Sequence, residues 1–276
     1  MKPPITYLGG KTTLAERIAN LLPEHEHYVE PFAGSLSVLL AKRLSDHETV
    51  NDLDADLVTF WRVLRDQPEE LERVCALTPH SRAEHAASYD VVGVPDVERA
   101  RRVWVQLTQG RAGVRTRTGW RHYVTPAGSS ASMPRYLAGY VGRIAPAAAR
   151  LVGVSLECRP ALEVIASYGR DSRVLLYVDP PYLGSARNSG GYLNDMPTEA
   201  QHRELAEALR ACKAAVVISG YPSDLYDRVL YRAWERHAMP ASTGQGGAWA
   251  NRTEVLWSNR PLPTQMSLLE DEEAAS

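Results

Sequence analysis

The amino-acid sequence predicts an α/β fold built on a largely parallel sheet, and three stretches carry this prediction. Residues 174–178 form a short, β-rich apolar run, which is typical of a strand covered on both faces. Residues 28–40 read as a short strand, a turn of small residues and an apolar helix, as in the first βα unit of a dinucleotide-binding sheet. Residues 49–54 read as a second strand that ends in an acid about 20 residues after that turn.

The remaining elements follow from helix and strand signals along the chain. A helix over Leu14–Leu22 ends before a proline, and a helix over Ala55–Asp66 follows Asp54, which can cap it. Residues 56–150 are far longer than a simple crossover, so they are expected to form an inserted, mostly helical segment. After it we expect a strand Val152–Glu157, helices Leu162–Tyr168 and Thr198–Lys213, a strand from Val216, and strands Trp234–Met239 and Glu254–Ser258 joined by a loop Ala241–Asn251.

Length and composition exclude several classes of protein. A chain of 276 residues suits one large domain or a core with an insertion. No apolar run is long enough to span a membrane, and the N-terminus lacks the apolar region of a signal peptide. The three cysteines are far apart and form no CxxC pair, so we expect a reducing cytoplasm, with neither a disulfide framework nor a metal site.

The net charge of −2 conceals a segregated distribution of charge. Residues 99–156 contain ten arginines and no acid, which gives this segment a charge of +10 against −12 for the rest of the chain. Such a block is typical of a protein with a polyanionic partner, although a solvated face could gather it by chance. We therefore expect this segment to face a nucleic acid.

The strand at residues 174–178 runs directly into Asp179-Pro180-Pro181-Tyr182. Prolines cannot donate to a strand ladder, so the strand stops at a stiff turn. Such a turn lies at the carboxyl end of a strand, where open α/β sheets bind ligands. Asp179 can accept a hydrogen bond from an amino group, and Tyr182 offers a ring on which a planar base can stack. A strand-ending turn with a solvated Asp and a packed Tyr is the simpler interpretation of this tetrapeptide alone.

The tetrapeptide resembles the motif (D/N/S)PP(Y/F/W) of the amino-methyltransferases that act on adenine or cytosine in DNA. Three further pieces resemble motifs of the same family: GGK at residues 9–11, EPFAG at 30–34 and NDLD at 51–54. With the arginine-rich segment between NDLD and DPPY, their order is similar to that of the Dam-like adenine-specific DNA methyltransferases (D12 class, α group). The resemblance covers about residues 5–260.

The resemblance implies a fold and a division of the chain. The fold is α/β, a Rossmann-like sheet of the SAM-dependent methyltransferase kind with a terminal antiparallel hairpin, plus an inserted, mostly helical target-recognition domain. Residues 1–56 and 151–262 are then the catalytic domain, 57–150 the recognition domain and 263–276 an acidic tail that we expect to be disordered. The recognition domain is expected to lie outside the cofactor edge of the sheet.

The resemblance also implies site residues. The expected catalytic residues are Asp179, Pro180, Pro181 and Tyr182. The expected contacts to S-adenosylmethionine are Tyr7, Gly9, Gly10, Lys11, Glu30, Pro31, Phe32, Ala33, Gly34, Asp52 and Asp179, with Asp54 as the alternative acid for the ribose. The expected DNA contacts are Arg111, Arg115, Arg117 and Arg121. The Gly/Ser-rich residues 183–192 are a candidate lid over an extruded base, and His202 is expected to be a solvated helix residue.

Two positions depart from the family pattern. Leu36 stands in place of the second glycine of EPFxGxGS, which would put a side chain where the backbone approaches the cofactor. Arg159 and Pro160 stand where the family often has an acid that helps to hold the cofactor's adenine. These departures are the only support for a protein that binds DNA but has lost transfer activity.

The function that this pattern favours is site-specific methylation of the adenine amino group in double-stranded DNA, by base flipping and direct transfer. We expect a cytoplasmic monomer or weak dimer, of restriction–modification or phage origin, that needs no metal. Three alternatives stay open: the impaired DNA-binding protein, a cytosine amino-methyltransferase, and a dinucleotide oxidoreductase, which nothing after residue 170 supports.

Overall fold

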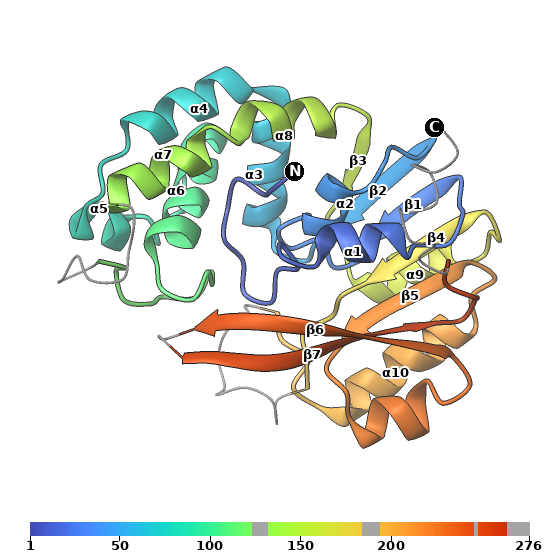
Figure 1. Ribbon diagram of the computed structural model, residues 1–276. Coiled ribbons are helices and arrows are strands. Elements are labelled where there is room, and N and C mark those ends of the chain that lie inside the picture. Colours follow the sequence, from blue (N-terminus) through green and yellow to red (C-terminus); the bar gives the residue numbers. More distant parts are fainter. Residues whose placement is uncertain (123–131, 184–193, 246–247, 264–276) are drawn as a thin grey trace, which may run out of the picture.

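The computed structural model describes residues 1–122, 132–183, 194–245 and 248–263 (Figure 1). In this part of the chain, seven strands form one sheet in the order β3-β2-β1-β4-β5-β7-β6. The strands are β1 His27–Glu30, β2 His47–Asn51, β3 Val154–Glu157, β4 Val174–Val178, β5 Ala215–Gly220, β6 Glu235–Gln245 and β7 Ala248–Ser258. Strands β1 to β5 are parallel, whereas β7 runs antiparallel to both β5 and β6. The predicted sheet with a terminal antiparallel hairpin is confirmed.

Both faces of the sheet are covered, as the apolar run of β4 predicts. Along β4, Leu175 and Tyr177 belong to one buried cluster, whereas Leu176 and its alternate neighbours belong to a second. Helices α9 (Ala161–Tyr168) and α10 (Glu199–Arg210) pack on the second face. Helices α1 (Ala15–Asn20), α2 (Ser37–Ala41) and α3 (Ala55–Asp66) pack on the first.

The segment between β2 and β3 is helical, as predicted. After α3 come α4 Pro68–Leu77, α5 Arg82–Ala87, α6 Asp96–Gln109, α7 Met133–Val141 and α8 Ile144–Leu151. These helices lie beside the sheet in Figure 1, and α3 packs against both α6 and α8. Trp104 of α6 and Leu151 of α8 belong to the same buried cluster as Leu175 of β4. One continuous core therefore joins this helical segment to the sheet.

Helix boundaries match the expected capping signals. The side chain of Asp54 accepts hydrogen bonds from the backbone nitrogens of Asp56 and Leu57, so Asp54 caps the predicted helix Ala55–Asp66. Thr198 caps α10 through a capping box with Gln201. In both cases a short polar side chain satisfies backbone donors that the first helical turn leaves unpaired.

The predicted loop Ala241–Asn251 is wrong, because the hairpin strands continue through it. The ladder between β6 and β7 extends without a break to the pair Gln245 and Ala248. Pro240 is tolerated within β6 because β6 is an edge strand, so no further strand needs its missing N–H group. Continuation of an established ladder outweighs the weak strand propensity of the Gly, Ser and Gln residues here.

The predicted solvation of His202 is also wrong. Its side chain is fully buried, with Nδ1 2.7 Å from the Tyr226 hydroxyl and Nε2 2.9 Å from the carbonyl oxygen of Met196. The helical period explains this position, since His202 shares the buried face of α10 with Leu205 and Leu209. Desolvation by burial lowers the pKa of His202.

Two expectations cannot be compared with the fold. Residues 184–192 of the expected lid and 264–276 of the expected tail lie outside the described residues. Among the residues that are described, no helix combines the length and the apolar character needed to cross a membrane. In the same ranges, no three His, Cys, Asp or Glu side chains gather in a way that could hold a metal ion.

Candidate active site

A cavity of about 370 Å³ opens at the carboxyl ends of β1, β2 and β4. The expected motifs converge on it, because parallel strands of one sheet end at the same edge. Of the residues expected to bind cofactor, it is lined by Tyr7, Gly9, Gly10, Lys11, Glu30, Pro31, Phe32, Ala33, Gly34, Asp52 and Asp179. Pro181 also lines it, whereas Tyr182 lines a separate cavity of about 90 Å³ together with Tyr221.

The turn after β1 is tethered on both sides. The Gly34 backbone nitrogen donates to Asp52 Oδ2 at 3.0 Å, and the indole of Trp61 donates to the Gly34 carbonyl at 3.1 Å. Asp52 Oδ1 accepts from the backbone nitrogen of Asp54 at 2.9 Å. Desolvation by burial raises the pKa of Asp52 to about 6 from its ordinary value of 3.8. The two backbone donors hold the Asp52 carboxylate at the mouth of the cavity.

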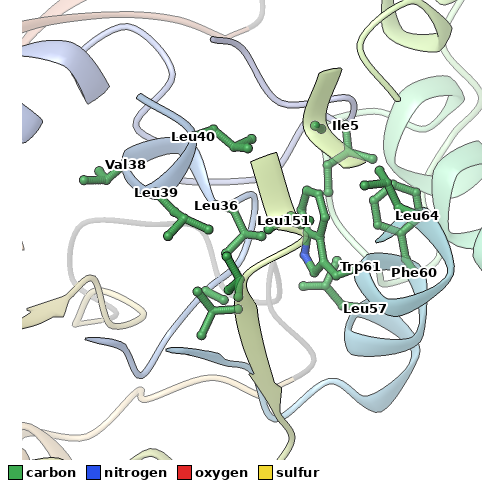
Figure 2. Close-up of a cluster of buried hydrophobic side chains, with 14 of the residues drawn as sticks. Ile5, Leu36, Val38, Leu39, Leu40, Leu57, Phe60, Trp61, Leu64 and Leu151 are labelled. Carbon is green, nitrogen blue, oxygen red and sulfur yellow. The ribbon is translucent and has the colours of Figure 1, made fainter. Parts of the chain in front are cut away.

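Leu36 does not fill the cavity, contrary to the expectation from sequence. Its backbone adopts the left-handed conformation that glycine favours, with φ of +55°. Its side chain is fully buried in the core and belongs to the same hydrophobic cluster as Leu39 and Trp61 (Figure 2). Burial of a leucine contributes roughly 2–3 kcal/mol, which offsets the roughly 1–2 kcal/mol that the left-handed conformation costs.

Glu30 ends β1 in a buried position at the cavity wall. Its Oε1 accepts hydrogen bonds from the Tyr28 hydroxyl at 2.5 Å and from the backbone nitrogen of Leu39 at 2.9 Å. Desolvation by burial raises the pKa of Glu30 to about 8. The carboxyl group therefore lies in surroundings that favour its neutral form unless a cation is brought next to it.

The Asp179 carboxylate is held by three side chains, two from other parts of the chain and one from its own turn. Lys11 Nζ lies 2.8 Å from both of its oxygens and also donates to the Gly9 carbonyl at 2.9 Å. The Ser219 hydroxyl of β5 lies 3.0 Å from Asp179 Oδ1, and the Tyr182 hydroxyl lies 3.1 Å from it. Since neither proline of the turn can donate, these side chains define where the carboxylate points.

Tyr182 is buried, and its hydroxyl is hydrogen-bonded to Glu254. Sequence reasoning did not single out this acid. The hydroxyl donates to Glu254 Oε1 at 2.6 Å, and Lys11 Nζ lies 4.9 Å from the ring centroid. Tyr221 packs edge-on against the ring, with centroids 4.7 Å apart. Glu254 is 4% exposed and lies on β7. Its only sequence signal is an acid in phase with Leu256, next to the apolar run Val255–Trp257.

This arrangement agrees with a family match over most of the chain. A family model described as D12 class N6 adenine-specific DNA methyltransferase matches residues 7–106 and 127–237. The chain belongs to this family. The two matched ranges lie on either side of the loop that contains the candidate DNA-contacting arginines.

Curated proteins with similar sequences match nearly the full chain. The Type II methyltransferase M1.LlaDCHI of Lactococcus lactis subsp. cremoris is 23% identical, covering 94% of this chain and 95% of that protein. A DNA adenine methylase of Vibrio cholerae is 24% identical, covering 91% of this chain and 93% of that protein. The solved structure of the rRNA methyltransferase aviRa of Streptomyces viridochromogenes aligns with 92% of this chain and 85% of its own chain, at 16% identity and a TM-score of 0.35.

Arg115, which was expected to contact DNA, lies inside the protein. Its guanidinium is buried, with Nε 2.9 Å from Asp54 Oδ2 and Nη2 2.6 Å from Asp56 Oδ2. A third hydrogen bond goes to the Gln106 side chain. The Arg115 guanidinium therefore donates to partners inside the protein and not towards solvent, where DNA would lie. Its role here is to fasten the loop after α6 to the start of α3.

The other three candidate arginines differ in exposure. Arg111 and Arg117 are exposed, and the Arg117 guanidinium lies 5.0 Å from the centroid of the Tyr89 ring. Arg121 is half-buried, lies 4.3 Å from the centroid of the Tyr136 ring and donates to the Thr108 carbonyl at 2.8 Å. Arg111 and Arg117 are therefore the members of this set that face solvent.

The loop after α6 also reaches the cavity, contrary to the expectation that the inserted segment lies outside the cofactor edge. The Gly113 carbonyl accepts a hydrogen bond from the Leu8 backbone nitrogen at 2.8 Å. Gly113, Val114 and Arg115 line the cavity. One side of this loop therefore forms cavity wall, while Arg111 and Arg117 are exposed on it.

Acids from other parts of the chain lie next to many of the arginines of residues 99–156. Five of its ten arginines form ion pairs with acids from outside residues 99–156: Arg99, Arg101, Arg102, Arg115 and Arg150, with Asp54, Asp56, Glu84, Glu98 and Glu48 as partners. The positive charge available to a polyanion is therefore smaller than the sequence block suggests.

Proposed function

We propose that this protein transfers a methyl group from S-adenosylmethionine to the exocyclic amino group of adenine at a specific site in double-stranded DNA. Membership of the D12 family supports adenine in DNA as the substrate. The observation that carries the finer proposal is the position of Asp179, whose carboxylate lies at the end of β4 beside the cavity. The Asp179 carboxylate, which can accept a hydrogen bond from an amine, thus lies next to the cavity that we assign to the methyl donor.

The chemistry of the cavity wall fits S-adenosylmethionine. Asp52 would accept hydrogen bonds from the ribose hydroxyls, and Glu30 would face the ammonium group. Phe32 and Leu162 supply apolar wall for the adenine. The glycine turns are tight, since a Cβ at Gly34 would lie 3.1 Å from the Tyr7 ring. When bound, this cofactor supplies an electrophilic methyl group on a sulfonium.

One backbone amide and the lysine ammonium of the GGK stretch already donate hydrogen bonds within the protein. The Gly10 nitrogen donates to the Tyr7 carbonyl at 3.0 Å, and the Lys11 ammonium binds Asp179. We therefore assign GGK mainly to shaping the cavity around Tyr7 and Gly9.

The proposed mechanism is direct transfer, in which the protein acts by position and charge. Asp179 and the Pro180 carbonyl accept hydrogen bonds from the target amine, which draws its lone pair out of conjugation and aims it at the cavity. The nitrogen–methyl bond would form as the sulfur–methyl bond breaks, and the methylated nitrogen would then lose one proton to water. The adenine leaves the duplex and stacks on the Tyr182 ring. The stiffness of the two prolines limits how far the acid and the ring can move apart.

We further propose that residues 57–150 recognise the DNA target, with Arg111 and Arg117 as the contacts to phosphate or base edges. The helical character of this segment and the exposure of the two arginines support this assignment. Cytoplasmic location and a monomeric or weakly dimeric state stay predictions.

The direct test is incorporation of tritiated methyl groups from S-adenosylmethionine into DNA that lacks methylated adenine. We expect label in N6-methyladenine at one short sequence, mapped by modification-sensitive sequencing. Label on cytosine would favour the cytosine amino-methyltransferase instead. DNA binding without any transfer would favour a protein that has lost activity.

A further inference from the structure

We propose that Glu254 is a positioning residue of the methyl-transfer site, which anchors the Tyr182 ring and shares the Lys11 ammonium with Asp179. This inference rests on the proposed function, because it assigns Tyr182 and Asp179 to the target base. Glu254 lies outside every motif that the sequence analysis singled out.

The sheet topology brings Glu254 to the site from a distant part of the chain. In β7, Val255 pairs with Gly220, the last residue of β5. Because β7 runs antiparallel to β5, Glu254 lies just beyond that pair, at the edge where the parallel strands end. Alternation along the strand turns Glu254 to the same face as Leu256, which shares a buried cluster with Tyr177 of β4.

The first role of Glu254 is to hold the end of the Tyr182 ring. The tyrosine hydroxyl oxygen lies on the axis about which the ring rotates, so its hydrogen bond fixes where the far end of the ring lies. Because a phenolic O–H prefers to lie in the plane of its ring, the direction of the acceptor also favours one ring plane. The Tyr182 hydroxyl donates to Glu254 at 2.6 Å, while the edge-on contact of Tyr221 restrains the ring from the side. Stacking of a base on an aromatic ring requires the two ring planes to be parallel and to overlap. Loss of this anchor should reduce stacking in the reactive geometry.

The second role concerns the charge on Asp179. Lys11 Nζ lies 2.8 Å from Asp179 and 3.7 Å from Glu254, so one ammonium stands between two carboxylates. Both lysine and Glu254 are almost fully buried, where such interactions are weakly screened. A second carboxylate draws part of the ammonium charge away from Asp179. Asp179 then stays a stronger acceptor for the target amine than it would be in an exclusive ion pair with Lys11.

The variants Glu254→Gln and Glu254→Leu separate the two roles. Glutamine keeps an oxygen that can accept from Tyr182 but carries no charge, whereas leucine removes both. We expect the single-turnover transfer rate, with plasmid DNA free of N6-methyladenine as substrate, to fall about tenfold in Glu254→Gln. A fall of a hundredfold or more is expected in Glu254→Leu, while the KM for S-adenosylmethionine changes less than about threefold.

A double-mutant cycle with Tyr182→Phe sharpens the test. In the Tyr182→Phe background the hydroxyl is already lost, so Glu254→Leu should remove only the charge contribution. Its fold-change there should match that of Glu254→Gln in the wild type within about threefold. Glu157→Gln is the matched control, because Glu157 also accepts from a tyrosine hydroxyl, that of Tyr168, at the far edge of the sheet. This control should keep the wild-type rate.

Crystal structures of the wild type and Glu254→Leu provide a readout that does not depend on activity. We expect the Tyr182 ring to leave its wild-type position in the leucine variant. Glu254→Leu with more than half of the wild-type rate, or with an unmoved Tyr182 ring, would overturn the proposal. A wild-type protein that methylates no DNA would overturn the proposed function, and the ring position would still decide whether Glu254 anchors Tyr182.

Discussion

Arg115 Nε lies 2.9 Å from Asp54 Oδ2, and this buried ion pair joins the loop after α6 to the cap of α3. Asp54 follows Asp52 by two residues, so the same short stretch holds the Gly34 turn and the loop that carries Arg111 and Arg117. This pair therefore connects the cavity wall at Asp52 and Gly34 to the arginine loop, in addition to the hydrogen bond between Gly113 and Leu8.

Replacement of Arg115 by Met should destabilise the protein and weaken cofactor binding. The change leaves the buried Asp54 carboxylate without its guanidinium partner, which typically costs roughly 3–5 kcal/mol, whereas Asp56 keeps its ion pair with Arg99. It also loosens Gly113 and Val114, which line the cavity. Urea unfolding and calorimetry with S-adenosylhomocysteine measure the two effects. Arg117→Met should change stability by less than about 0.5 kcal/mol, and equal losses in both variants would contradict the assignment.

At position 36, glycine should be tolerated better than alanine. Both variants lose a buried leucine side chain, which typically costs roughly 2–5 kcal/mol. Glycine recovers roughly 1–2 kcal/mol of left-handed strain but gives back roughly 0.4–1 kcal/mol through the entropy of the unfolded chain. Leu36→Gly should thus be up to roughly 1.6 kcal/mol more stable than Leu36→Ala in urea unfolding. The opposite order would mean that the φ of +55° is not a source of strain.

Cofactor affinity should fall as the pH drops below about 6, the raised pKa of Asp52. The ribose hydroxyls need the ionised carboxylate as acceptor, so affinity should fall up to about tenfold per pH unit there. For stability the sign is opposite: a raised folded-state pKa contributes stability that is full below 3.8 and is lost as the pH rises through about 6. Calorimetry with S-adenosylhomocysteine should show the affinity step in the wild type.

Asp52→Asn should remove the step near pH 6, whereas Glu30→Gln should leave it in place. Glu30 is expected to add a separate gain in affinity as the pH rises towards about 8, its own raised pKa. A wild-type step near pH 6 that survives in Asp52→Asn would move the ribose contact to another acid.

Replacement of Arg111 and Arg117 together by Ala should flatten the salt dependence of DNA binding. Each phosphate contact contributes about −0.9 to the slope of log affinity against log salt, so the slope should change by up to about 2. An arginine that instead reads a base edge should relax sequence choice by roughly 1–3 kcal/mol. The control is Arg173→Ala, because Arg173 is exposed at the other end of β4. Unchanged slope and unchanged site preference would remove this loop from the DNA interface.

Much of the site could be predicted because its motifs are local. GGK, EPFAG, NDLD and DPPY each consist of neighbouring residues at a turn or strand end, and parallel strands bring such ends to one edge. The strand run before Asp179 and the cap at Asp54 are likewise short-range signals, and both appear in the structure as expected.

Several of the features that sequence reasoning missed depend on pairing across long distances in the chain. Glu254 reaches Tyr182 across 72 positions, and Arg115 reaches Asp54 across 61. A count of charge along residues 99–156 cannot show that its arginines meet acids from other segments. In the same way, the composition of residues 241–251 suggested a loop because it did not reveal the partner strand that continues the ladder.

The most direct test of the central claim is the rate of methyl transfer to adenine in DNA by Asp179→Ala, compared with the wild type. The carboxylate is argued to act on the target amine and not to hold most of the cofactor. We therefore expect transfer to be abolished while the affinity for S-adenosylhomocysteine stays within a few fold. A variant that keeps more than about a tenth of the wild-type rate, equivalent to a loss of less than roughly 1.4 kcal/mol of transition-state stabilisation, would contradict the account.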